Sequence, residues 1–193
     1  MERTIGVYGG SFNPVHTGHL LVASYIAQWT GIDEVWLMLS PLNPFKADSS
    51  MAPTDHRLAM LSLAVEPTPW LKVSTVQLTM PVPSYTIDAL DLLAREYPHC
   101  RFKCVIGSDS WERFGEWRQA DRILSDYGVV IYPRPGYPID PADLPKGVEI
   151  AAAPTVDISS TFVRRGIAEG KNMSYFVPTA VYDYIVKHNL YTH

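Results

Sequence analysis

The sequence has no long apolar run, no block of like charge and very little cysteine. No stretch approaches the roughly 20 apolar residues that cross a bilayer, and Met1–Ile5 lacks the apolar segment of a signal peptide. We therefore expect a cytoplasmic protein with no membrane partner. The net charge of -4 and the scattered basic residues give no general attraction for a polyanion. A nucleic-acid partner is therefore not expected.

The two cysteines are too few to make a closed zinc site. Cys100 and Cys104 have only His99 beside them. Cys104 alternates with Phe102 and Ile106 in an apolar run, which indicates core filling. We predict no metal site built from protein ligands.

The composition is that of a folded protein. The chain has 193 residues, 47% of them hydrophobic and 19% charged, which suits a single domain over residues 1–193. Strand and helix patterns alternate: strands are expected at 4–8, 34–39, 71–78, 102–106 and 128–132, and helices at 20–29, 55–65, 86–96 and 117–125. Alternation predicts a Rossmann-like, doubly wound α/β fold, with a parallel sheet, helices on both faces and ligands at the carboxyl ends of the strands.

The remaining segments are a helical end and two loops. Ser159–Glu169 and Pro178–His188 have helical patterns, so residues 159–193 are predicted to form a small helical C-terminal subregion. The proline-rich stretches Pro41–Pro53 and Pro133–Pro145 follow predicted strands and are candidate substrate loops.

A glycine turn follows the first predicted strand, in the order Gly9, Gly10, Ser11, Phe12. Glycine lets the backbone approach a phosphate closely, and the next helix start points amides toward it. We therefore predict an anion site. The turn matches neither a P-loop nor a G-x-G-x-x-G fingerprint, although Asp33 lies at a distance along the chain that suits a ribose contact. NAD binding is a weak alternative.

Two histidines lie three residues apart at the start of the first helix. His16 and His19 enclose Gly18, and at this spacing both imidazoles can face one ligand. A single histidine there is usually structural, whereas two after a Gly-Gly turn favour contacts with charged oxygens. Metal binding ranks lower because no third ligand lies nearby.

Two motifs at opposite ends of the chain resemble those of the H-x-G-H nucleotidyltransferase superfamily. They are His16-Thr17-Gly18-His19 and Ser159-Ser160-Thr161-Phe162-Val163-Arg164. Ser159 can cap a helix whose first amides hold phosphate, and Arg164 can add a charge-assisted donor. Alone, the second motif would indicate an ordinary helix cap.

Three further segments resemble the nicotinate-nucleotide adenylyltransferase family, and the resemblance extends over essentially the whole sequence. They are Ser40–Lys46, Pro83–Asp88, and Ile106–Asp109 followed by Trp117. Phe45 stands where the family has His, whereas Lys46 is retained. Each segment also has a plain interpretation, because Lys46 can be solvated and Trp117 can belong to the core.

The resemblance implies transfer of AMP from ATP to nicotinate mononucleotide, giving nicotinate adenine dinucleotide and pyrophosphate. It implies that Mg²⁺ is carried mainly by ATP, and it assigns neutralisation of phosphate oxygens to four residues, His16, His19, Lys46 and Arg164. ATP contacts are expected from Gly9, Gly10, Ser11, Phe12, Gly18, Gly107, Asp109, Ser159, Ser160 and Thr161. Acceptor contacts are expected from Tyr85, Thr86, Trp117 and Arg134.

Three alternatives stay open. The acceptor can instead be phosphopantetheine or nicotinamide mononucleotide, or the chain can be a nucleotide sensor without catalysis. Residues 84–88 and 109–117 argue against phosphopantetheine. The sequence leaves open whether the chain forms a homo-oligomer.

Overall fold

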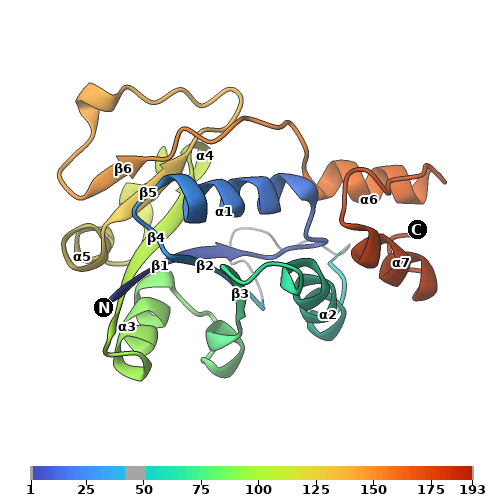
Figure 1. Cartoon of the computed structure of the whole chain (residues 1–193), viewed down its shortest axis with the longest axis horizontal. Coiled ribbons are helices and arrows are strands. Elements are labelled where there is room, and N and C mark those ends of the chain that lie inside the picture. The colour runs from blue at the N-terminus through green and yellow to red at the C-terminus, as the bar shows by residue number, and fades with distance from the viewer. Residues whose placement is uncertain (1, 42–50, 193) are drawn as a thin grey trace.

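The computed structural model describes residues 2–41 and 51–192. Its centre is a six-stranded sheet in the order β3-β2-β1-β4-β5-β6 (Figure 1), with parallel pairing throughout. The strands are β1 (Arg3–Gly10), β2 (Glu34–Leu39), β3 (Leu71–Ser74), β4 (Cys100–Gly107), β5 (Val129–Tyr132) and β6 (Val148–Ile150). The predicted Rossmann-like parallel α/β fold is confirmed.

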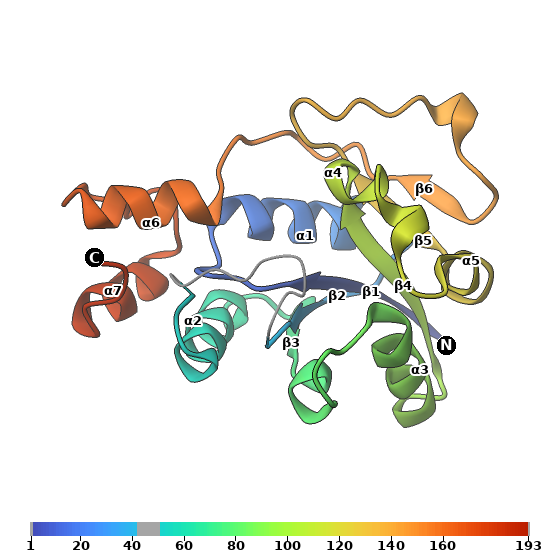
Figure 2. The ribbon, with the colours of Figure 1, turned by 180° about the vertical axis from the view of Figure 1, so that it is seen from behind.

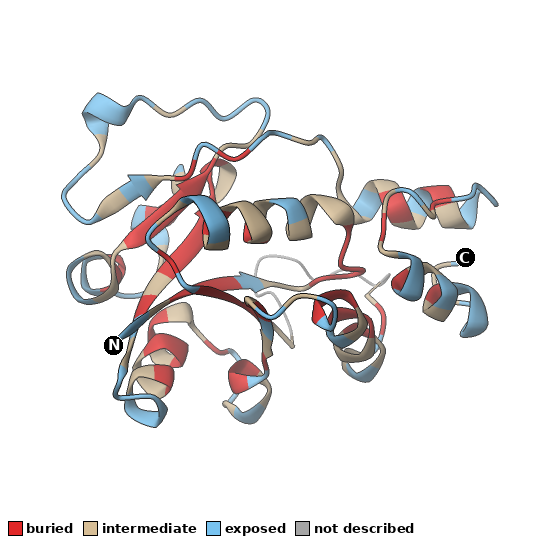
Figure 3. Ribbon diagram, viewed as in Figure 1, coloured by how far each residue is buried: buried red, intermediate tan, exposed pale blue. Residues whose placement is uncertain are grey.

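Helices cover both faces of the sheet. The main helices are α1 (Thr17–Trp29), α2 (Thr54–Val65), α3 (Thr86–Glu96), α6 (Ser160–Ala168) and α7 (Thr179–Lys187), with the short helices α4 (Ser108–Trp111) and α5 (Ala120–Arg122). One hydrophobic core unites α1, α2, α6 and α7 with one face, and a second joins α3 and α5 to the other. Figure 3 shows the buried residues concentrated in the sheet and on the inward helix faces.

The alternating side chains of the strands explain the two cores. In β2, Val35, Leu37 and Leu39 belong to the first core, whereas Trp36 and Met38 belong to the second. Successive strand residues point to opposite faces, so a strand buried on both sides is apolar throughout. Cys104 belongs to the second core, and burial raises the pKa of its thiol to about 12. The interpretation of Cys104 as core filling is confirmed.

The C-terminal helices gather at one end of the molecule. Helices α6 and α7 lie beside each other there, far from β6, in both Figure 1 and Figure 2. Helix α7 packs against α2, which anchors the end of the chain to the first half of the fold. The predicted helices of residues 159–169 and 178–188 are confirmed within one or two residues.

Two local predictions were wrong, and one strand was missed. The strand expected at 71–78 ends at Ser74, and a 3-10 turn over Val76–Thr79 carries the chain over the second core. The helix expected at 117–125 is only the short α5, because Gln119 takes a left-handed φ of 54° and a π-helical turn follows at Ile123–Tyr127. Strand β6 was not predicted.

Candidate active site

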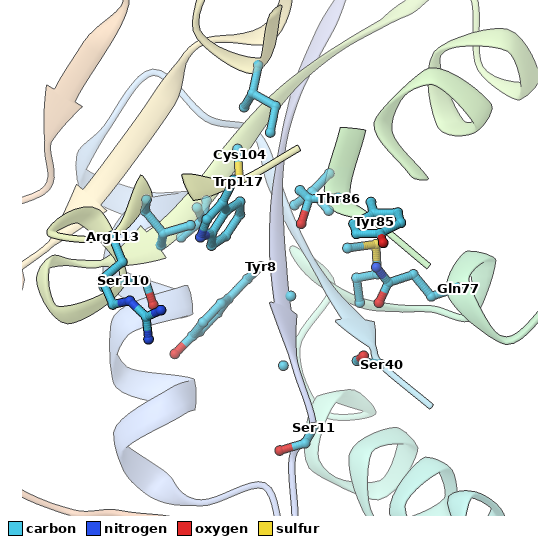
Figure 4. Close-up of a pocket in the computed structure, with 18 of the residues that line it drawn as sticks. Tyr8, Ser11, Ser40, Gln77, Tyr85, Thr86, Cys104, Ser110, Arg113 and Trp117 are labelled. Atoms are coloured by element: carbon cyan, nitrogen blue, oxygen red, sulfur yellow. The ribbon is translucent and has the colours of Figure 1, made fainter. Parts of the chain in front are cut away.

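The site lies where the strand order reverses. Strands β1 and β4 are neighbours, but the chain continues from them to opposite edges of the sheet, and such a switch point opens a crevice at the carboxyl ends. A cavity of about 390 Å³ occupies this place, lined from β1 by Gly9 and Gly10 and from β4 by Gly107. We call it the acceptor cavity (Figure 4).

Asp33 lies at the opposite end of the sheet. Its carboxylate accepts a hydrogen bond from the Thr4 amide, 2.7 Å away, before β2 begins. A ribose bound at the carboxyl ends of the strands cannot reach it. The ribose contact from Asp33 that the NAD-binding alternative suggested is therefore not possible in this fold.

Gly107 leaves room for the Asp109 carboxylate. A Cβ at Gly107 would lie 2.3 Å from Asp109 Oδ1, so a larger residue would displace that group. Asp109 lines the acceptor cavity and faces the Arg134 guanidinium at 3.9 Å. The structure thus brings these three predicted residues together at the end of β4.

A second, smaller hollow lies beside the first. It is lined by His16, Gly18, His19, Val22 and Arg134, among others, and we call it the histidine hollow. Tyr8 and Tyr132, whose hydroxyl oxygens are 2.9 Å apart, line both hollows. Arg134 therefore lines the histidine hollow, whereas Tyr85, Thr86 and Trp117, the other residues expected to contact the acceptor, line the acceptor cavity.

The two histidine rings stack with their centroids 3.6 Å apart. The backbone amide of His16 donates to His19 Nδ1 at 3.2 Å, so His19 Nδ1 is an acceptor and its ring proton resides on Nε2. Gly18 keeps the spacing, because a Cβ there would lie 3.1 Å from His16 Cε1 and Nδ1. His19 thus presents a neutral N–H donor.

His16 is only 3% exposed, and burial, with Arg134 nearby, lowers the pKa of its imidazole to about 3. The ring is therefore neutral near pH 7. A buried imidazole loses hydration when it is protonated, so His16 would meet a phosphate as a neutral ring, and its expected phosphate contact stays a prediction. Its Nδ1 has no hydrogen-bond partner among the described residues.

This burial predicts a pH-dependent stability. In the unfolded chain His16 gains a proton near pH 6.5, whereas in the folded chain it does so only near pH 3. Between these pH values the unfolded state binds more protons, so the free energy of unfolding decreases as the pH falls below 6.5. Wild type should lose about 1.5 kcal/mol more than His16→Gln between pH 6.5 and 5. Urea unfolding at both pH values measures the difference. Equal losses would mean that His16 titrates normally when folded.

Phe12 is buried and packs against His19. Its backbone φ is 43°, its side chain is 1% exposed, and it lines neither hollow. The ring instead meets His19 edge-on at 5.0 Å and Tyr8 at 5.8 Å. Phe12 was expected to contact ATP, but its side chain is packed into the core.

Hydrogen bonds join the two distant motifs. Ser160 Oγ donates to the Pro14 carbonyl at 2.9 Å, and Arg164 Nη1 donates to the Asn13 carbonyl at 2.9 Å. Ser159 Oγ accepts from the Phe162 amide at 3.1 Å, as expected of a helix cap. Thr161 Oγ1 lies 3.5 Å from Arg164 Nη2. The start of α6 is thereby fixed against the loop that follows β1.

Two further segments line the acceptor cavity on opposite sides. Tyr85 and Thr86 lie at the start of α3, and Trp117 lies across the cavity from them (Figure 4). Tyr85 is the N-cap residue of α3 and makes no side-chain capping bond. Ser84, which the sequence analysis did not single out, directly precedes Tyr85 and also lines the cavity. Its buried Oγ has no hydrogen-bond partner among the described residues.

A buried arginine lies beneath the first turn. Arg57 is 1% exposed, and its guanidinium donates to the Ser11, Ser40, Pro41 and Ala52 carbonyls and to Thr54 Oγ1, at 2.7–3.0 Å. It ties together the ends of β1 and β2. This role could not be predicted from the sequence, because the partners of Arg57 are mostly backbone carbonyls.

Some expectations cannot be compared with the structure. Lys46 and Phe45 lie outside the described residues. Within the described ranges, no three His, Cys, Asp or Glu side chains gather as metal ligands, and no helix is long and apolar enough to span a bilayer.

Comparison with known proteins identifies the family. The cytidylyltransferase-like family model matches residues 7–166. A Bacteroides fragilis protein described as a probable nicotinate-nucleotide adenylyltransferase is 44% identical over 182 residues, covering 94% of this chain and 90% of that protein. A Flavobacterium johnsoniae protein with the same description is 36% identical over 195 residues, covering 97% and 98%.

A solved structure shares the fold. Plasmodium falciparum nicotinic acid mononucleotide adenylyltransferase, complexed with NaAD, superposes with a TM-score of 0.79 at 21% identity, over 98% of each chain. The same protein complexed with APC gives a TM-score of 0.78 over 98% of each chain. With the sequence matches at 36–44% identity over nearly the full length, the chain belongs to the nicotinate-nucleotide adenylyltransferase family, within the cytidylyltransferase-like group.

Proposed function

We propose that the protein transfers AMP from ATP to nicotinate mononucleotide, forming nicotinate adenine dinucleotide and releasing pyrophosphate. The observation that carries this proposal is the pair of adjoining hollows, which share Tyr8 and Tyr132 as their common wall. One hollow offers histidines and an arginine for a triphosphate, and the other offers Trp117 and the start of α3 for an aromatic acceptor. Two nucleotides bound in this way bring their phosphates together.

The reaction needs no protein nucleophile. The 5′-phosphate of the acceptor attacks the α-phosphorus of ATP in line, a new P–O bond forms, and the bond to pyrophosphate breaks. The task of the protein is to position two anions and stabilise the charge that develops on the phosphate oxygens.

Several of the predicted site residues have distinct parts in this task. His19 Nε2–H donates to a phosphate oxygen, His16 fixes the His19 tautomer through its amide, and Arg164 holds the loop at Asn13. We propose that Gly9, Gly10 and Ser11 present backbone to the phosphates and that Asp109 receives a ribose hydroxyl. Lys46 remains a proposed phosphate contact.

Mg²⁺ enters this proposal as part of the substrate. The ion would be held by the ATP phosphates and water rather than by a protein cage. Such an ion would offset negative charge on the triphosphate.

A pyrophosphate-release assay tests the function. ATP is supplied with nicotinate mononucleotide, nicotinamide mononucleotide or phosphopantetheine, and release is expected to be fastest with the first. No release with any acceptor, despite measurable ATP binding, would indicate a nucleotide sensor. Fastest release with phosphopantetheine would replace the proposed acceptor.

The acid form of the pyridine nucleotide should be preferred to the amide. The first amides of α3 have no side-chain cap, and Ser84 Oγ beside them is unpartnered among the described residues. The backbone N–H donors favour a carboxylate and offer nothing to an amide NH₂, whereas the Ser84 hydroxyl can bond to either group. We expect kcat/KM to be higher for nicotinate mononucleotide by about tenfold or more. Equal values for the two mononucleotides would refute this account of the pocket.

A further inference from the structure

Among the described residues, four charged side chains line the acceptor cavity, and three of them, Asp109, Arg113 and Glu116, lie close to a side chain of opposite charge. Arg113 donates to both carboxylate oxygens of Glu116, at 3.2 and 2.6 Å. Asp109 faces Arg134, which lines the adjoining hollow. These pairs leave little net charge on that side of the cavity.

Arg118 is different. Among the described residues its ion-pair partner is Asp88, which lies 3.6 Å away and is not part of the cavity lining. At 3.6 Å the contact is an ion pair but too long for a hydrogen bond, and the structure gives the Arg118 guanidinium no hydrogen bond among the described residues. Arg118 therefore presents a positive charge and uncommitted N–H donors at the cavity.

The Arg118 guanidinium lies over one of the residues that should hold the pyridine ring. Arg118 directly follows Trp117, and its guanidinium carbon lies 4.8 Å from the centroid of the Tyr85 ring. That cation–π contact restrains a side chain that is otherwise 51% exposed. Ser84, next to Tyr85, adds a buried hydroxyl without a partner among the described residues.

We propose that Arg118 is a specificity-determining residue that selects an acceptor with a carboxylate on its pyridine ring. The proposal rests on the function proposed above and extends it from the backbone donors of α3 to a charged side chain. A carboxylate placed between Trp117 and Tyr85 gains a charge-assisted contact with Arg118. A carboxamide in the same place offers only a neutral oxygen and gains less.

The test compares two mononucleotides in matched variants. Arg118→Met removes the charge but keeps much of the aliphatic stem. We expect kcat/KM for nicotinate mononucleotide to fall about tenfold, with the value for nicotinamide mononucleotide changing less than about twofold and KM for ATP unchanged. Arg118→Lys keeps the charge and should retain part of the selectivity.

Arg122→Met is the matched control. Arg122 pairs with Asp91 on α3 at 2.9 Å, as Arg118 pairs with Asp88, but it does not line the cavity. Its acid-to-amide ratio should equal that of wild type. Asp88→Asn should maintain or raise the ratio, because it removes the carboxylate that competes for Arg118.

The outcomes separate the two proposals. If wild type prefers the acid and Arg118→Met has the same ratio, the role of Arg118 is wrong and the proposed function stands. A fall in the ratio for Arg122→Met as large as that for Arg118→Met would also overturn it, because the effect would then be general. If wild type uses neither mononucleotide, the proposed function itself fails.

Discussion

Replacing His19 with alanine is expected to lower kcat by about 10²–10³-fold, because a preorganised donor aimed at developing charge has an effect of that size. His19 Nδ1 accepts from the His16 amide, so the ring proton available for donation is on Nε2, and His19 lines the histidine hollow. The interaction is stronger in the transition state than in the ground state, and KM should therefore change less than kcat.

Two amide variants test the two ring nitrogens of His19 separately. Asparagine places a polar atom near the position of Nδ1 and can still accept from the His16 amide, but it lacks a donor at the Nε2 position. Glutamine reaches the Nε2 position and loses the Nδ1 acceptor. If Nε2–H is the group that acts, His19→Asn should resemble alanine and His19→Gln should retain part of the activity.

Steady-state pyrophosphate release measures all three variants, and thermal unfolding shows whether each remains folded. The His19 ring also packs against Phe12 and His16, so some loss of stability is expected in each variant. Near-normal kcat in a folded His19→Ala protein would rule out a catalytic role for the ring.

The fold was predictable because local and global patterns agree. Apolar runs such as Glu34–Leu39 occur at strand length, and helices such as Thr86–Glu96 have an apolar face, so the alternating order could be deduced without tertiary information. Strand β6 was missed because three residues at the edge of a sheet give almost no periodic signal. The break at Gln119 was missed because a left-handed residue in an otherwise helical pattern is decided by packing.

The candidate site was predictable where its residue types are unusual. Two histidines around a glycine, and a serine pair followed by an arginine, are informative because their spacing restricts what they can contact. The charge state of His16 could not be predicted, since it depends on burial in the folded chain. Arg118 was missed because an arginine is common at a surface, and only its position over Tyr85 at the cavity distinguishes it.

The largest effect on stability is expected at Arg57. A guanidinium has five N–H donors, and each of the five contacts described above is an oxygen within 3.0 Å. Among the described residues no carboxylate pairs with it, so four backbone carbonyls and one hydroxyl stabilise the charge. Burial lowers the pKa of Arg57 from its ordinary value, but arginine keeps its proton at any ordinary pH.

Arg57→Met should therefore cost about 3–5 kcal/mol of unfolding free energy, because it leaves four buried or partly buried carbonyls without this donor. That is a large part of the roughly 5–15 kcal/mol that keeps a domain folded. Arg57→Lys supplies three donors from one atom and should lose less than methionine but still be destabilised, because one ammonium cannot span Ser11, Pro41 and Ala52 together.

Urea unfolding measures these losses against Arg101→Met, which removes an exposed arginine whose partner Glu2 is also exposed and should cost at most about 1 kcal/mol. Activity gives a second measurement, because Arg57 fixes the Ser11 carbonyl at the first turn and the Ser40 and Pro41 carbonyls at the end of β2. In a variant that remains folded, kcat should fall even though Arg57 lines neither hollow. An Arg57→Met protein as stable as Arg101→Met would show that water or a rearranged backbone satisfies those carbonyls, and that the arginine does not hold the two strand ends together.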